Sequence, residues 1–111
     1  MWLLDVNVPK RLAGVLGEFG VPAQTAEARG WNGLTNGRLV EAAVEAGFSC
    51  VLTRDRLFSE SAARALKRFP QFCVVLVTFP QLRGPEFLEQ FRLAWDRGKV
   101  QPVPGRLLRW P

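Results

Sequence analysis

Two short segments of the chain are apolar at nearly every position, and they constrain the fold more than any other feature. They cover residues 49–53 and 73–77. A strand without alternating polar residues is typical of a parallel sheet that helices cover on both faces. Between the apolar runs stand segments with apolar residues at helical spacing. This β-α alternation predicts a three-layer α/β/α sandwich with right-handed crossovers.

The chain of 111 residues fits a single domain, 1–111, with a mostly parallel sheet of four or five strands. The last segment, 99–111, is predicted either as a short edge strand or as a tail packed through apolar side chains, and the sequence does not choose. The expected strands are 2–4, 21–25, 49–53 and 73–77, and the expected helices are about 9–19, 37–46, 58–69 and one opening at 84–86.

Composition excludes several kinds of site. The chain has no His and two Cys, Cys50 and Cys73, both inside apolar runs, so zinc sites and His-dependent triads are excluded and reduced thiols are expected. No apolar run approaches the roughly 20 residues that cross a bilayer, and Asp5 interrupts the apolar start, so a cytoplasmic protein is expected. The net charge of +5 indicates either a polyanion partner or only a basic surface.

Two of the expected strands are followed within two residues by an aspartate, Asp5 after 2–4 and Asp55 after 49–53. In an open parallel sheet, ligands bind outside the carboxyl ends of the strands, so both carboxylates are predicted at one edge. Oxygen ligands suit Mg²⁺ or Mn²⁺. The alternative is that each Asp only caps the helix that follows its strand.

Three further polar residues accompany this pair. Asn7 is expected to support the metal site, or else to make an Asx turn or cap the first helix. Asn36 is expected either to act in catalysis or to cap the second helix. Thr53 is expected to orient Asp55 through its hydroxyl, although a β-branched residue ending a strand needs no special role.

Candidate nucleic-acid-binding residues lie around the same positions. Arg54 and Arg56 flank Asp55 and could clamp a phosphate, with Arg38 nearby, or they could simply face water. Trp31, in a glycine-rich loop, is either a platform for base stacking or a lid folded over the apolar rim.

Four sequence motifs occur in a characteristic order: Leu-Leu-Asp-Val-Asn-Val-Pro at the start, Gly-Trp-Asn-Gly-Leu-Thr-Asn at 30–36, Ala-Ala at 42–43, and Thr-Arg-Asp-Arg-Leu-Phe at 53–58. Over residues 1 to 80 the chain thus resembles the PIN-like family of small bacterial proteins, which are related to the PIN-domain ribonucleases of toxin–antitoxin pairs. The resemblance implies an acidic cluster that holds Mg²⁺ or Mn²⁺ and hydrolyses RNA. It also implies an antitoxin protein partner and a homodimer.

The chain departs from the family pattern at three positions where acids are common. The opening is usually Asp-Glu-Asn, and here Val6 replaces the Glu. Asn36 stands where an Asp usually leads the second helix, and Leu57 replaces the second Asp after the third strand. What remains is two carboxylates with amide help, enough for a weak ion site completed by RNA.

Three functions therefore remain open. The first is a divalent-metal-dependent ribonuclease of toxin–antitoxin type, in which a metal-activated water attacks the phosphodiester. The second is a relative that has lost catalysis and acts by binding nucleic acid or a partner protein. The third, a phosphotransfer domain phosphorylated on Asp5, is disfavoured because no Lys follows the fourth strand.

Overall fold

Five parallel strands and four helices build the domain. The computed structural model describes residues 1–80 and 83–111, with Asn36 described by its backbone alone. The strands are β1 (Trp2–Leu4), β2 (Ala23–Thr25), β3 (Cys50–Thr53), β4 (Cys73–Val77) and β5 (Leu107–Trp110). The helices are α1 (Leu12–Glu18), α2 (Asn36–Glu45), α3 (Arg56–Ala65) and α4 (Gly84–Arg97).

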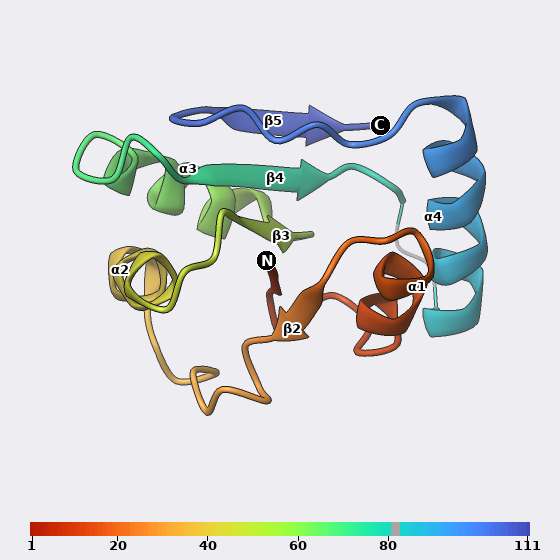
Figure 1. The fold of residues 1–111 in the computed structure, drawn as a ribbon, viewed down its shortest axis with the longest axis horizontal. Coiled ribbons are helices and arrows are strands. Elements are labelled where there is room, and N and C mark those ends of the chain that lie inside the picture. Colours follow the sequence, from red (N-terminus) through yellow and green to blue (C-terminus); the bar gives the residue numbers. More distant parts are fainter. Residues whose placement is uncertain (81–82) are drawn as a thin grey trace.

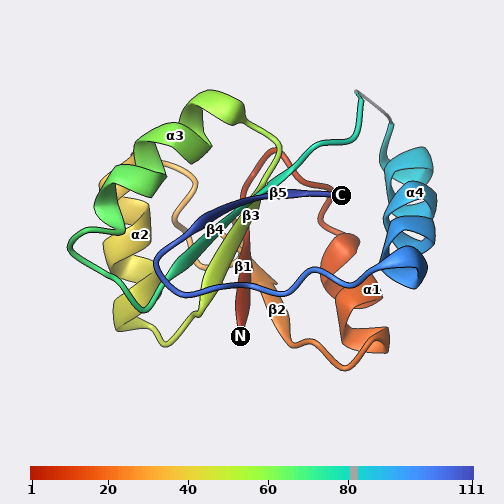
Figure 2. The same cartoon turned by 90° about the horizontal axis from the view of Figure 1, so that it is seen from above.

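The sheet has the order β2-β1-β3-β4-β5, and every neighbouring pair is parallel. Helices α1 and α4 cover one face, and α2 and α3 cover the other, as Figures 1 and 2 show. The predicted three-layer α/β fold is therefore confirmed, with five strands. The undecided segment 99–111 contains β5, an edge strand paired with β4.

Side chains alternate between the two faces along each strand, so the sheet separates two apolar clusters. Leu4, Leu52 and Val75 pack against α1 and α4, whereas Leu3 and Val51 pack against α2 and α3. Since β3 and β4 are buried on both faces, their sequences show no polar alternation. This explains why 73–77 could be predicted to the residue from its composition.

One connection breaks the expected handedness. The chain moves from β1 to β2 in one direction across the sheet and from β4 to β5 in the other, yet α1 and α4 lie on the same face (Figure 2). These two crossovers therefore have opposite hands, and β4-α4-β5 is the left-handed one. Right-handed connections are the strong rule in parallel sheets. Here α2 and α3 already occupy the opposite face, and α4 covers the half of the sheet that α1 leaves open.

The two cysteines lie on neighbouring strands, where Cys50 is the register partner of Cys73. Both are buried free thiols, as expected. Burial raises the pKa of each thiol. They are therefore core residues and not nucleophiles.

Phe91 is the aromatic centre of the α4 interface, because its ring contacts Phe87, Trp95 and Trp110 and is fully buried. We expect Phe91→Ala to lower the free energy of unfolding by about 3–5 kcal/mol, the usual loss for a buried Phe. Leu93 lies on the same helix and is 45% exposed. Leu93→Ala should change stability by no more than about 0.5 kcal/mol. Urea denaturation of both variants measures the difference, and equal losses would contradict this assignment of the core.

Candidate functional site

The candidate site lies at the point in the sheet where the chain reverses the direction in which it adds strands. The chain runs from β1 outward to β2 and then returns past β1 to form β3, so β1 and β3 are neighbours at the topological switch point. In this strand order, ligands bind outside the carboxyl ends of these two strands. Leu4 is the register partner of Leu52, and the Asp5 amide donates to the Leu52 carbonyl at 3.0 Å. Asp5 and Thr53 therefore emerge side by side.

The Thr53 hydroxyl is the centre of a hydrogen-bond network at this edge. It donates its one proton to Asp5 Oδ2 at 2.8 Å. It accepts from Asn7 Nδ2 at 3.2 Å and from the Asp55 amide at 3.1 Å. One donated and two accepted bonds use the full capacity of a hydroxyl. The expected hydrogen bond between the Thr53 hydroxyl and Asp55 is present at the Asp55 backbone amide, and the same hydroxyl also holds the Asp5 carboxylate, which was not expected.

The Asn7 side chain takes part in the same network through both of its polar atoms. Its Oδ1 accepts from the Arg54 amide at 3.0 Å, while its Nδ2 donates to Thr53. The carboxamide therefore links the loop after β1 to the loop after β3. These bonds fix the Asn7 side chain beside Asp5, and its role in supporting a metal site stays a prediction.

Asp5 is a buried carboxylate held only by neutral donors. The residue is 8% exposed, and its Oδ1 accepts from the Val6 amide at 2.8 Å while Oδ2 accepts from Thr53. Among the described residues, none of the ion pairs includes Asp5. It does not cap α1, whose N-cap is Arg11 without a side-chain bond. The capping alternative is therefore wrong for Asp5.

Asp55 differs from Asp5 because it is exposed and serves as the N-cap of α3. Its Oδ1 accepts from the Phe58 amide at 3.1 Å. The capping alternative is thus confirmed for this residue. The cap uses one of the two carboxylate oxygens, and the role of Asp55 as a metal ligand stays a prediction.

The ionisable groups at this edge are few. In the part of the chain that the structure describes, no group of three or more His, Cys, Asp or Glu side chains gathers where it could hold a metal. The donor set predicted from sequence, two carboxylates with amide and hydroxyl oxygens, is hard in character. Such donors suit Mg²⁺ or Mn²⁺.

Asn36 is the first residue of α2, and Thr35 is its N-cap. The prediction that Asn36 caps this helix is therefore wrong by one position. Its side chain lies outside the described part of the structure, so its catalytic role stays a prediction.

The candidate arginines occupy different surroundings. Arg54 is half-buried, with its guanidinium carbon 4.8 Å from the centre of the Phe87 ring on α4. Arg56 begins α3 and lies 4.0 Å from Glu60, an exposed pair. Arg38 is a half-buried residue of α2 that lines a surface hollow with Leu34 and with other side chains of its own helix. Of these, Arg54 is joined to the Thr53 network, through its backbone amide.

Trp31 packs onto the α2/α3 face. Its ring meets Phe48 edge-on at 5.9 Å, and the Arg29 guanidinium lies over both rings, 5.4 Å from that of Trp31. The alternative in which Trp31 folds over the apolar rim is therefore observed. Its predicted base-stacking role has no support from this geometry.

Two features of the edge escaped prediction. Val6 and Leu57 are 57% and 68% exposed, so two of the three positions that depart from the family pattern present apolar side chains to solvent. Phe87 forms the platform under Arg54, although the two are far apart in sequence. A signal for Phe87 could have come only from knowing that α4 packs beside α1.

Comparison of the chain with protein-family models, with curated proteins and with solved structures found no match. Among the helices that the structure describes, none has both the length and the apolarity needed to span a membrane.

Thr53→Val tests whether the hydroxyl organises this edge. The change keeps the side-chain shape but removes the Thr53 partner of Asp5 Oδ2, of Asn7 Nδ2 and of the Asp55 amide. We expect a loss of about 2–3 kcal/mol in the free energy of unfolding. Thr25 is a matched control, because its hydroxyl accepts one exposed bond, from the Ala28 amide. A Thr53→Val variant no less stable than Thr25→Val in urea denaturation would contradict this role.

Proposed function

We propose that the chain is a PIN-like, divalent-metal-dependent ribonuclease of toxin–antitoxin type. The supporting observation is Asp5, which is buried at the switch point with no basic partner among the described residues. A buried carboxylate is costly unless a cation or several donors compensate it. A cation bound from solvent would compensate the Asp5 carboxylate, and this would explain why Asp5 lies at the carboxyl edge of the sheet.

Asp5 and Asp55 would hold the Mg²⁺ or Mn²⁺ ion, with Asn7 and Thr53 fixing Asp5 in place. When bound, such an ion lowers the pKa of water and neutralises charge that develops on a phosphate. Mg²⁺ commonly binds through one or two carboxylates together with substrate phosphates, so two carboxylates are sufficient if RNA supplies further oxygens. Asn36, which begins α2, is the remaining catalytic candidate.

The chain itself offers groups that could bind the RNA backbone. The Arg54 side chain is anchored over Phe87, so little of its conformational freedom remains to be lost when it pairs with a phosphate. Arg56 is only loosely paired with Glu60 and could join it. The net charge of +5 favours approach of a polyanion. An antitoxin protein that binds over this edge, and a homodimer, belong to the same proposal.

Calorimetric titration with Mn²⁺ tests the metal site directly. We expect saturable binding in the wild type that falls by about tenfold or more in Asp5→Asn and in Asp55→Asn, because each change removes one charged ligand. Asn remains a good N-cap, so Asp55→Asn should leave α3 intact. Asp96→Asn is the control, since it removes the same charge from an exposed position on α4. If Asp5→Asn bound Mn²⁺ as tightly as Asp96→Asn, the assignment would be lost.

A second candidate function is favoured by Val6 and Leu57. Because both side chains are exposed, an acid at either position would reach solvent at this edge, and their apolar character leaves the ion site with two carboxylates. The chain would then be a catalytically degenerate relative that binds RNA without cleaving it. Such binding would depend on salt and not on the metal.

Restoring the two acids separates the candidates. The double variant Val6→Glu/Leu57→Asp changes two exposed side chains, so we expect stability to change by less than about 1 kcal/mol. If the chain is degenerate, the wild type should bind RNA in EDTA and cleave none with Mn²⁺, and the double variant should gain Mn²⁺ affinity. Val103→Glu, at another exposed apolar position, controls for added charge. Metal-dependent cleavage by the wild type, abolished in Asp5→Asn, would contradict the degenerate candidate.

A further inference from the structure

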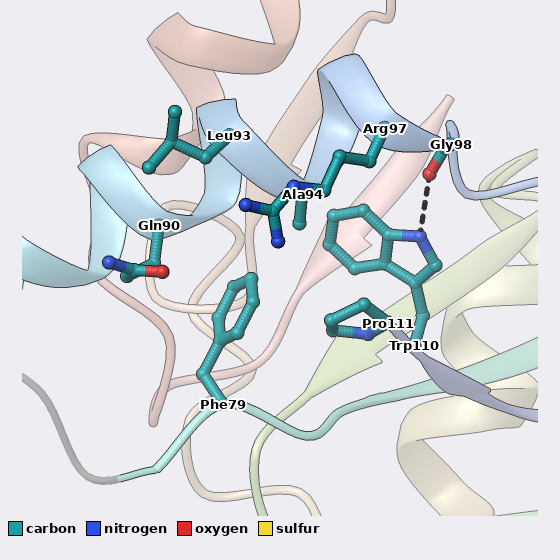
Figure 3. A pocket seen from close by; sticks show the side chains of 8 residues that line it. All are labelled: Phe79, Gln90, Leu93, Ala94, Arg97, Gly98, Trp110 and Pro111. Carbon is teal, nitrogen blue, oxygen red and sulfur yellow. Dashed lines mark hydrogen bonds between the residues drawn. The ribbon is translucent and has the colours of Figure 1, made fainter.

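A cavity of about 450 Å³ lies between the outer side of α4 and the edge strand β5 (Figure 3). This volume is within the range of small-molecule sites in proteins. None of its lining residues is among the site residues predicted from the sequence. The lining residues are Phe79, Gln90, Leu93, Ala94, Arg97, Gly98, Trp110 and Pro111.

Two aromatic rings form one wall of this cavity. Phe79 and Trp110 meet at 64° with their centres 5.8 Å apart, and both are half-buried. Trp110 is held rigidly, because its indole Nε1 donates to the Gly98 carbonyl at 2.9 Å and its ring packs on Phe91 at 4.9 Å. The cavity therefore has a fixed aromatic surface that needs no rearrangement before a planar group stacks on it.

Helix α4 supplies the polar groups. Gln90, Ala94 and Arg97 are spaced by four and three residues and share one side of the helix. Figure 3 shows the Arg97 guanidinium pointing back along the helix into the space beside Phe79 and Trp110. Arg97 takes part in none of the ion pairs among the described residues. A cation and a carboxamide therefore face an aromatic wall.

Contacting rings connect this cavity to the Asp5 edge. Phe79 follows β4 at the carboxyl end of the sheet, and its ring meets Phe87 edge-on at 5.5 Å. Phe87 in turn carries the Arg54 guanidinium at 4.8 Å. A strand of RNA lying along this edge would meet Arg54, then the Phe79 ring, and then the cavity.

We propose that this cavity is a nucleobase subsite for single-stranded RNA. The base stacks on Phe79 and Trp110, Gln90 hydrogen-bonds to its edge, and Arg97 pairs with the neighbouring phosphate or stacks on the base. An aliphatic side chain of a protein partner would fit less well, because it would remove water from Gln90 and Arg97 without giving them partners. The inference rests on RNA being the substrate class of the proposed function, and it does not require catalysis.

The first experiment follows the Trp110 indole N–H resonance by NMR during titration with single-stranded oligoadenylate in EDTA. Chelation removes any contribution of a metal at Asp5 and Asp55, so the subsite is observed independently of the metal proposal. We expect the Trp110 resonance to shift saturably, and the Trp31 resonance to stay unchanged because that ring lies under Arg29.

The second experiment measures the Kd of the same oligoadenylate for two variants. Arg97→Gln should raise Kd by about tenfold, the loss of one charge-assisted contact. Arg64→Gln is the matched control, because Arg64 is also a basic residue in the last turn of its helix, α3. It should raise Kd by less than about threefold, through net charge alone.

Each outcome has a distinct meaning. Oligoadenylate binding in which Trp110 does not shift, or in which the two variants weaken binding equally, would overturn the subsite while leaving RNA as the substrate class. Absence of oligoadenylate binding in EDTA would overturn the subsite and would leave the metal-dependent ribonuclease to be decided by the Mn²⁺ titration of Asp5→Asn. A Trp110 shift in EDTA, lost in Arg97→Gln, would support the subsite even if Mn²⁺ titration failed. Dimerisation that Leu93→Glu abolishes, with Trp110 insensitive to RNA, would assign the cavity to a second copy of the chain and overturn the subsite.

Discussion

The hydrogen bond that the Thr53 hydroxyl donates to the Asp5 carboxylate determines the arrangement of the candidate site. The bond joins the ends of β1 and β3, which are neighbours in the sheet although 48 residues separate these two positions in the chain. Because Thr53 also accepts from the Asp55 and Asn7 groups, the loops after both strands are fixed by a single atom. The carboxylate of Asp5 is therefore oriented before any ligand arrives, which is the property that a preorganised site requires.

Sequence patterns were sufficient to place strands whose residues are almost all buried. Both 2–4 and 73–77 were predicted to the residue, because strands buried on two faces contain almost nothing polar. Segment 107–110 was left open because its pairing comes from register with β4, and nothing local specifies that contact. The prediction of right-handed crossovers was wrong at β4-α4-β5 for a related reason. Which face α4 covers depends on the area that the other three helices leave uncovered.

The site shows the same division. Asp5, Asn7, Thr53 and Asp55 were found because strand ends can be located in a sequence and parallel strands bring their carboxyl ends together. Their hydrogen-bond partners could be assigned only in part: the bond between Thr53 and Asp55 was expected, whereas the bonds of Thr53 to the Asp5 carboxylate and to Asn7 were not. Trp31 was ambiguous, because a glycine-rich loop does not reveal whether an aromatic ring points outward. The aromatic contacts of Phe79 and Phe87 depend on tertiary packing and leave no pattern in the sequence.

The left-handed β4-α4-β5 crossover also has a consequence for the order in which the domain can form. Residues 1–77 contain four of the five strands and both helices of the α2/α3 face, but only α1 covers the opposite face. During synthesis, the apolar side of β3 and β4 therefore stays open to solvent until Phe87, Phe91 and Trp95 emerge. Exposed sheet surface of this kind promotes association. Helix α4 thus covers the apolar side of β3 and β4, and the partly synthesised chain stops being prone to association once α4 has emerged and packed.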